Sequence, residues 1–425
     1  MLLSYFFVIL YDNIKFKKSM EKTGHSLVKK EYLLPFILVT SLFFMWGFAR
    51  AILDVLNKHF QQTMDISVSH STLIQVTTYL GYFLMAIPAG IFINRWGYRR
   101  GVVLGLILFG LGSLMFIPGE NLNSFNAFLI ALFVVGCGLV VLETAANPYI
   151  TELGDRSTGA SRLNLAQSFN GLGCVVAPAM VGHVLFSEGG SVAVPYTIMA
   201  VIVLAIALVF TRVKLPEILT DDSAETASTV KESTTTIIGK LLRNRTFMLG
   251  IGALFFYEIA EISINSLFIN YVTNDAWMTP ALAATVLSFC GLGLFMCARV
   301  AGSWIMSRIA AEKVLVVCAI GTVLGSLLVT LNIGIASKVG LFACYAFEAI
   351  MFPTVFALSV RGLGTRTKIA SSLLMMTPIG GAVGTLLMGH IADQISISSS
   401  FIVPCIGYTF VLIYSIYALT RLKSK

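Results

Sequence analysis

Residues 125–148 read FNAFLIALFVVGCGLVVLETAANP, a run of 24 residues with a single charged side chain, Glu143. As an α-helix, a run of this length is about 36 Å long, which exceeds the roughly 30 Å of hydrocarbon in a bilayer. Lipid offers no hydrogen-bonding partner to the backbone, so a run of this kind that crosses a membrane must be helical. The stretch therefore predicts a membrane-spanning helix that carries a carboxyl group into the bilayer.

Comparable apolar runs occur along the whole chain. Of its 425 residues, 57% are hydrophobic and only 12% are charged. A soluble protein usually carries about 25% charged residues, so a soluble cytoplasmic enzyme is excluded. We predict an all-α membrane protein with twelve transmembrane helices. Besides 125–148, the expected spans are 33–60, 71–94, 101–118, 163–186, 193–212, 246–272, 281–305, 314–333, 339–361, 369–391 and 399–420.

The basic residues indicate the orientation of these spans. If both termini are cytoplasmic, 25 of the 29 Lys and Arg residues fall on the cytoplasmic side, as the positive-inside rule requires. The net charge of +8 is therefore a topology signal, and no nucleic-acid partner is expected. A polar segment between the sixth and seventh spans predicts a linker between two halves. The expected parts are a tail 1–32 (with 1–19 as a possible mis-start upstream of Met20), a six-helix bundle 33–212, a cytoplasmic linker 213–245, a second bundle 246–420 and a tail 421–425.

The two halves repeat one another in sequence. The spacing Glu-x4-Pro of Glu143 and Pro148 recurs 205 residues later in Glu348 and Pro353. Three other pairs recur at offsets of 207 to 212: Gly182-His183 with Gly389-His390, Asp54 with Glu261, and Gly90 with Gly302. Parallel repeats of this kind place a binding site between the halves, near the middle of the membrane. We therefore expect two pseudo-symmetric six-helix bundles.

The stretch at 90–100, GIFINRWGYRR, resembles the loop signature of the major facilitator superfamily. Asn94 stands where that signature has Asp, which weakens the usual ion pair of the loop. The residues expected to form this gating loop are Gly90, Asn94, Arg95, Gly97, Arg99 and Arg100.

More specifically, the chain resembles the fucose–galactose–glucose:proton symporters over roughly residues 33–420. The stretches that carry the likeness include FFMWG at 43–47, LETAANP at 142–148 and RLNLAQSFN at 162–170. The resemblance implies the major facilitator fold and the import of a monosaccharide, such as L-fucose or a related hexose, by proton symport. It also implies that the protein is a monomer in the cytoplasmic (inner) membrane of a bacterium. Transport would then be driven by the proton gradient, with no cofactor.

Five acidic residues lie well inside the predicted spans: Asp54, Glu143, Glu258, Glu261 and Glu348. Charged groups at the bilayer centre cost about 2.5 kcal/mol or more by insertion scales, so a functional role is the default interpretation. A carboxyl group in a medium of low dielectric constant favours its neutral form and is thus suited to carrying a proton. The resemblance assigns proton coupling to Asp54 and Glu143.

Arg50 complicates this assignment, because it lies one helical turn before Asp54 and a guanidinium favours the ionised carboxylate. It could pair with Asp54, pair with Glu143 across the cavity, or contact an anionic sugar. Amide side chains nearby offer both a donor and an acceptor to sugar hydroxyls. The expected substrate-binding residues are Arg50, Gln75, Asn147, Asn170, Glu261, Asn265 and Glu348.

The chain has no sign of enzyme chemistry. It has no G-x4-G-K-[ST] phosphate loop, and its five histidines and seven cysteines show no metal-ligand spacing, so no metal site is expected. The alternatives that stay open are a sugar-acid or sodium-coupled symporter, an exporter of the same fold, and a membrane sensor that binds sugar without moving it.

Overall fold

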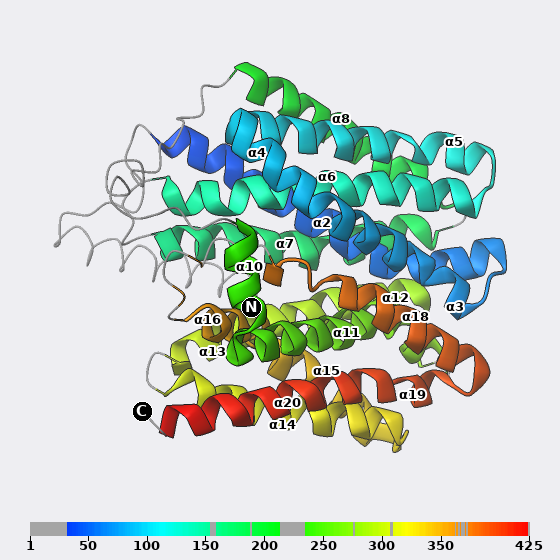
Figure 1. Ribbon diagram of the computed structural model, residues 1–425. Coiled ribbons are helices and arrows are strands. Elements are labelled where there is room, and N and C mark those ends of the chain that lie inside the picture. The colour runs from blue at the N-terminus through cyan, green and yellow to red at the C-terminus, as the bar shows by residue number, and fades with distance from the viewer. Residues whose placement is uncertain are drawn as a thin grey trace, which may run out of the picture.

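The computed structural model describes residues 32–153, 159–187, 189–212, 234–274, 277–306, 309–361 and 373–423, together with Leu363, Arg366 and Ala370. The described elements are helices, and they form two bundles that lie side by side (Figure 1). The linker residues 213–233 and the segment 1–31 lie outside the described residues.

The first bundle contains the helices of the N-terminal part of the chain. α2 packs against α7, and α4 packs against α6 and α8. Its helices are α2 (Leu33–Met64), α3 (Val68–Ser71), α4 (Leu73–Leu114), α5 (Phe116–Asn121), α6 (Phe125–Glu152), α7 (Gly159–Leu185) and α8 (Ala193–Arg212).

The second bundle follows a short helix, α10 (Thr234–Leu242), that lies within the linker predicted at 213–245. α11 packs against α18 and α20, and α14 packs against α15 and α20. Its elements are α11 (Arg245–Asn274), α12 (Pro280–Val286), the π-helical segment η4 (Leu287–Leu292), α13 (Gly293–Met306), α14 (Ala311–Thr330), α15 (Gly334–Glu348), α16 (Met351–Val360), α18 (Ile379–Gln394), α19 (Ile397–Ser400) and α20 (Ile402–Lys423).

Within the described residues, eleven helical stretches are long and apolar enough to cross a membrane. They match eleven of the twelve predicted spans, with ends that differ by a few residues, except that the third begins at Arg95 rather than at 101. The remaining predicted span, 369–391, contains helical residues Leu373 and Leu374 and most of α18, which begins at Ile379 after a turn at residues 375–378 that ends in Pro378. Hydropathy does not reveal a helix start inside an apolar run, whereas proline favours the beginning of a helix.

Two sequence features break apparently continuous helices. Gly97 has φ 82° and ψ 166°, a left-handed conformation that suits glycine, and it divides α4 into two membrane-crossing parts. The predicted span 339–361 is divided into α15 and α16. Near this break, Pro353 has no N–H to offer the carbonyl of Ala349, four residues earlier, so one helical hydrogen bond is missing there.

The bundles meet at the end of the molecule that carries α3, α5 and α19, which we call the far end (Figure 1). Asp393 of α18 accepts hydrogen bonds from the backbone N–H groups of Val68 (2.9 Å) and Ser69 (2.7 Å) in α3. Gly389 approaches the same segment so closely that a Cβ atom there would lie 3.0 Å from the Cα of Ser69. The glycine therefore permits this close contact between the bundles.

A line of amides and hydroxyls between α2 and α11 continues this contact towards the centre. The Asn57 amide donates to the backbone oxygen (2.9 Å) and the hydroxyl (2.8 Å) of Ser266. The Asn270 amide donates to Gln61 (2.6 Å), on the neighbouring turn. Asn57 and Ser266 are completely buried, so water does not compete for these bonds. We call the contacts of Asp393 and this line together the far-end seal.

We predict that Asp393→Ala loosens the far-end seal, since it removes both hydrogen bonds to α3. The measurement uses a protein without native cysteines that carries Thr72→Cys. It is the rate at which the thiol at position 72 reacts with a polar thiol reagent. Thr72 is completely buried beside Gly389. The rate should rise severalfold. His390→Ala, an exposed neighbour on α18, serves as the control and should leave the rate unchanged. Equal rates in the Asp393→Ala protein, the His390→Ala protein and the protein with neither change would contradict a sealing role for Asp393.

Candidate functional site

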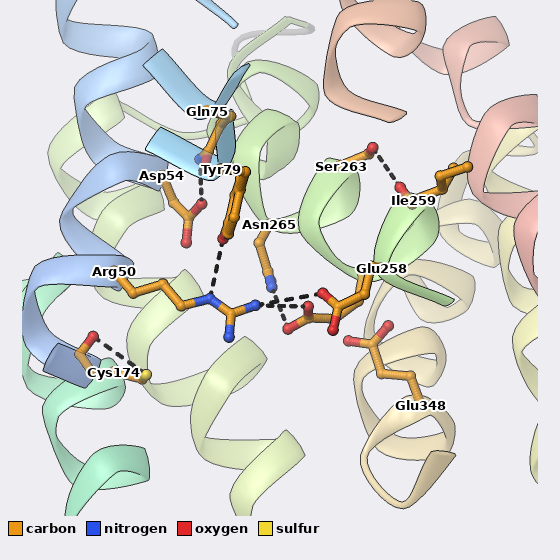
Figure 2. A network of polar contacts seen from close by, with 12 residues as sticks. Arg50, Asp54, Gln75, Tyr79, Cys174, Glu258, Ile259, Ser263, Asn265 and Glu348 are labelled. Atoms are coloured by element: carbon orange, nitrogen blue, oxygen red, sulfur yellow. Dashed lines mark hydrogen bonds and ion pairs between the residues drawn. The ribbon is translucent and has the colours of Figure 1, made fainter. Parts of the chain in front are cut away.

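Arg50 is the centre of the polar cluster between the bundles (Figure 2). Its Nη2 atom lies 3.2 Å from Oε2 of Glu261 and 3.8 Å from Oε2 of Glu258, both on α11. Its Nε atom donates a hydrogen bond of 3.1 Å to the hydroxyl of Tyr79 on α4. The ion pairs of Arg50 therefore connect the first bundle with the second.

Asp54 lies one turn beyond Arg50 on α2, but it is not an ion-pair partner of Arg50. Among the described residues, its hydrogen bond comes from the Gln75 amide of α4, at 3.2 Å (Figure 2). Both side chains are buried. The expectation that Arg50 pairs with Asp54 or Glu143 is thus replaced by the pairing across the bundles. Helical spacing identifies neighbours on one face, but the facing helix supplies the closer partners.

Glu143 of α6 accepts a hydrogen bond of 3.0 Å from the hydroxyl of Tyr82. It is half-buried, and so is Asn147 one turn further along α6. The Asn147 amide oxygen is buried and has no hydrogen-bond partner in the structure. Glu143 and Asn147 are thus both partly accessible, and both can accept further hydrogen bonds.

The hydroxyl groups of Tyr79 and Tyr82, which bond to Arg50 and Glu143, were not predicted as site residues, although the sequence shows their spacing. Gln75, Tyr79 and Tyr82 recur at intervals of four and three residues, which places them on one face of α4. That face carries partners for Asp54, Arg50 and Glu143 in turn.

The remaining predicted residues divide into two groups. Asn265 donates to Oε1 of Glu261 at 3.1 Å, and so belongs to the Arg50 cluster. Asn170 donates to the backbone oxygen of Phe43 at 3.2 Å, a contact within the first bundle that also fixes α7 against α2. Its half-buried side chain is nevertheless partly accessible.

Glu348 of α15 is completely buried and accepts a hydrogen bond from the hydroxyl of Tyr408. Its carboxyl group points towards the Arg50 cluster (Figure 2), and its Oε1 atom has no hydrogen-bond partner. Arg299 of α13 donates to the carbonyl of Ala349 at 3.0 Å. This is the carbonyl that Pro353 leaves without a helical donor.

The expected gating loop lies apart from this cluster, around the break in α4. Arg95, Arg99 and Arg100 are exposed, and the Arg95 guanidinium lies 4.9 Å from the centre of the Trp96 ring. Gly90 has open space around it. The side chain of Asn94 lies outside the described residues, so the structure does not test its role.

The cluster combines carboxyl groups, amides and tyrosine hydroxyls inside a membrane-spanning bundle. These groups both donate and accept hydrogen bonds, as recognition of a polyhydroxylated molecule requires. In the part of the chain that the structure describes, no group of three or more His, Cys, Asp or Glu side chains is arranged to hold a metal ion.

Residues 36–368 match the family model described as Major Facilitator Superfamily. The chain belongs to the Major Facilitator Superfamily. This membership accounts for the helical fold of the described residues, is consistent with the predicted twelve membrane-spanning helices, and identifies the protein as a multi-span membrane transporter rather than an enzyme.

Two relatives illustrate the similarity. The L-fucose-proton symporter of Escherichia coli (strain K12) is 33% identical over 412 residues, which cover 91% of this chain and 93% of that protein. A glucose/galactose transporter of Brucella abortus is 33% identical over 399 residues, which cover 91% of this chain and 95% of that protein.

Solved superfamily structures agree with the fold. The E. coli fucose:proton symporter, in a structure of its outward conformation, matches with a TM-score of 0.69 at 32% identity, over 92% of this chain and 99% of that one. A bacterial homologue of the human lysosomal transporter Spinster, in an inward-facing conformation, matches with a TM-score of 0.72 at 17% identity, over 93% and 99%. The second likeness concerns the fold alone.

The pairing of Arg50 predicts the pattern of energetic coupling in the site. In a double-mutant cycle, Arg50→Gln and Glu261→Gln should be non-additive by about 0.5–3 kcal/mol, as expected for residues in contact. Arg50→Gln and Asp54→Asn should couple more weakly, because Asp54 bonds to Gln75 instead. The free energy of unfolding of the purified protein gives both values. Stronger coupling of Arg50 to Asp54 would contradict the pairing described above.

Proposed function

We propose that this transporter imports a neutral monosaccharide, L-fucose or a related hexose, together with protons by alternating access. The observation that carries the proposal is the set of membrane-embedded carboxyl groups at the junction of α2, α4, α6 and α11, of which Asp54, Glu143 and Glu261 are hydrogen-bonded to an amide or a tyrosine hydroxyl. The two relatives above, named as an L-fucose-proton symporter and a glucose/galactose transporter, support it.

The charge of the cluster favours a neutral sugar over a sugar acid. Arg50 is the group that could attract an anionic substrate, but Glu258 and Glu261 already lie within ion-pair distance of it. An added carboxylate would bring a further negative charge beside these two. A sugar hydroxyl can instead accept from Arg50 and donate to Glu261 without changing the charge.

In this proposal, Asp54 and Glu143 carry the coupled proton, and the sugar contacts Arg50, Gln75, Asn147, Asn170, Glu261, Asn265 and Glu348. The protein acts as a monomer in the bacterial inner membrane, uses the proton gradient and needs no cofactor. The predicted division into bundles 33–212 and 246–420 with both termini cytoplasmic is part of it. The far-end seal then closes the outer side, and the structure represents an inward-facing conformation.

A binding screen over hexoses, deoxyhexoses and sugar acids tests the substrate class. Uptake into proteoliposomes then separates a transporter from a sugar sensor, and an imposed pH gradient with and without sodium separates proton from sodium coupling. We expect accumulation of a neutral sugar when the outside is acidic, independent of sodium. Binding without uptake would favour the sensor instead.

Glu143→Gln should abolish accumulation of the sugar against its gradient while exchange across the membrane persists. An amide retains hydrogen-bonding capacity towards Tyr82 but cannot carry a proton. Concentrative uptake and counterflow in proteoliposomes measure the two activities separately. Glu312→Gln provides a control, since Glu312 is a buried acid that pairs with Arg361 at 2.8 Å, away from the cluster. Full accumulation by the Glu143→Gln variant at mildly acidic pH would refute its role in coupling.

Asn170→Cys should place a thiol in the central space between the bundles. In a protein without native cysteines, sugar should protect this thiol from a small polar reagent, because the half-buried side chain lies beside the proposed binding space. The exposed residue Asp65, replaced by cysteine, is the control at the far end and should gain no protection. If the thiol at position 170 does not react either with or without sugar, the contact of Asn170 with Phe43 is a packing contact only.

A further inference from the structure

The Arg50 cluster contains more carboxyl groups than cations. Oε2 of Glu261 and Oε2 of Glu258 lie 3.2 and 3.8 Å from the same Nη2 atom of Arg50. If both acids were ionised, one guanidinium would face two carboxylates and one negative charge would stay uncompensated. Inside a membrane protein, buried charges are normally paired, and an unpaired one is neutralised by a proton.

The one further cation nearby is Arg299, whose charge acts on Tyr257 and Glu348, but it donates to the carbonyl of Ala349, and among the described residues it forms no ion pair with Glu258. The titratable groups near Glu258 are Arg50 and Asp54 on α2, Tyr79 on α4, Glu143 on α6, Tyr257 and Glu261 on α11, and Glu348 on α15. In this set, Arg50 is the one cation. The additional groups are acids or tyrosines, which add no positive charge.

The two carboxyl groups are not equivalent. Glu261 has the shorter contact with Arg50, accepts a hydrogen bond from Asn265 and is 13% exposed. Glu258 has the longer contact, is 4% exposed, and its Oε2 atom is buried without a hydrogen-bond partner. The ionised form is therefore better stabilised on Glu261, and the neutral form is better suited to Glu258.

We propose that Glu258 holds a proton in this conformation, and that Arg50, Glu261 and Glu258 form a proton-dependent lock between the two bundles. This adds a proton-binding residue in the second bundle to Asp54 and Glu143 of the first. Its role in transport rests on the proposed function, whereas the protonation of Glu258 does not.

The lock lies where the two bundles must move against each other. Arg50 belongs to α2 and both acids belong to α11, so any motion that separates these helices removes the guanidinium from the acids. Glu261 then loses its counter-charge, and protonation becomes the remaining way to neutralise it. A sugar whose hydroxyls replace the guanidinium at Glu261 would also favour protonation of Glu261. Opening of the lock is thereby linked to the uptake of a proton by the second bundle.

Infrared spectroscopy of the protein in lipid tests the proton on Glu258 directly, through the carbonyl stretching band of protonated carboxyl groups. Glu258→Gln should reduce this band by the intensity of one carboxyl group at neutral pH. Glu261→Gln should reduce it equally, because Arg50 and Glu258 then form a one-to-one ion pair. Arg50→Gln should increase the band by the intensity of one carboxyl group, since Glu261 loses its counter-charge and takes up a proton.

Glu312→Gln is the matched control, because Glu312 is a buried acid with its own arginine, Arg361, and should leave the band unchanged. Glu258→Asp should restore the band, which a loss of packing alone would not explain. An unchanged band in Glu258→Gln, or an unchanged band in Arg50→Gln, overturns the proposal. Failure of the wild-type protein to accumulate sugar in proteoliposomes would instead refute the proposed function and leave the infrared result standing.

Discussion

An arginine inside a membrane span needs partners for its charge, and for Arg50 the acidic partners lie on the other bundle. The pairing with Glu261 and Glu258 sets how α2 and α11 face each other. Further along the same two helices, Asn57 meets Ser266 and Gln61 meets Asn270. Residue numbers increase together along this line, so the two helices run parallel, as the repeat of the two halves requires.

The membrane-spanning helices could be predicted because their physical cause is local. Any apolar run of about 20 residues in lipid must satisfy its own backbone, whatever surrounds it. The start of α18 and the break between α15 and α16 could not be placed by hydropathy, since apolar residues lie on both sides of each boundary. Pro353 lies close to the second break, and Arg299 donates to the Ala349 carbonyl that Pro353 leaves without a helical donor.

The members of the polar cluster could be predicted from the cost of charge in lipid, but their pairing could not. Arg50 and Asp54 are one turn apart, and this spacing makes an ion pair within α2 plausible. The observed partners depend on the rotation of α11 relative to α2, which no spacing within either helix specifies. Asn170 illustrates the same limit, because an amide between helices satisfies a backbone carbonyl, here that of Phe43, as readily as a sugar hydroxyl.

The contacts between α2 and α11 differ in what it takes to break them. The bonds of Asn57 and Gln61 join neutral groups, and such bonds between membrane helices contribute only about 0.6–2 kcal/mol each. They can open and close during a transport cycle without any change of charge. Separating Arg50 from its acids instead leaves ionised groups in a medium of low dielectric constant, unless a proton or a substrate hydroxyl takes the place of the partner. The Asn57 and Gln61 contacts of the far-end seal are therefore suited to alternate freely, and the Arg50 cluster is the place where movement of the bundles depends on what is bound.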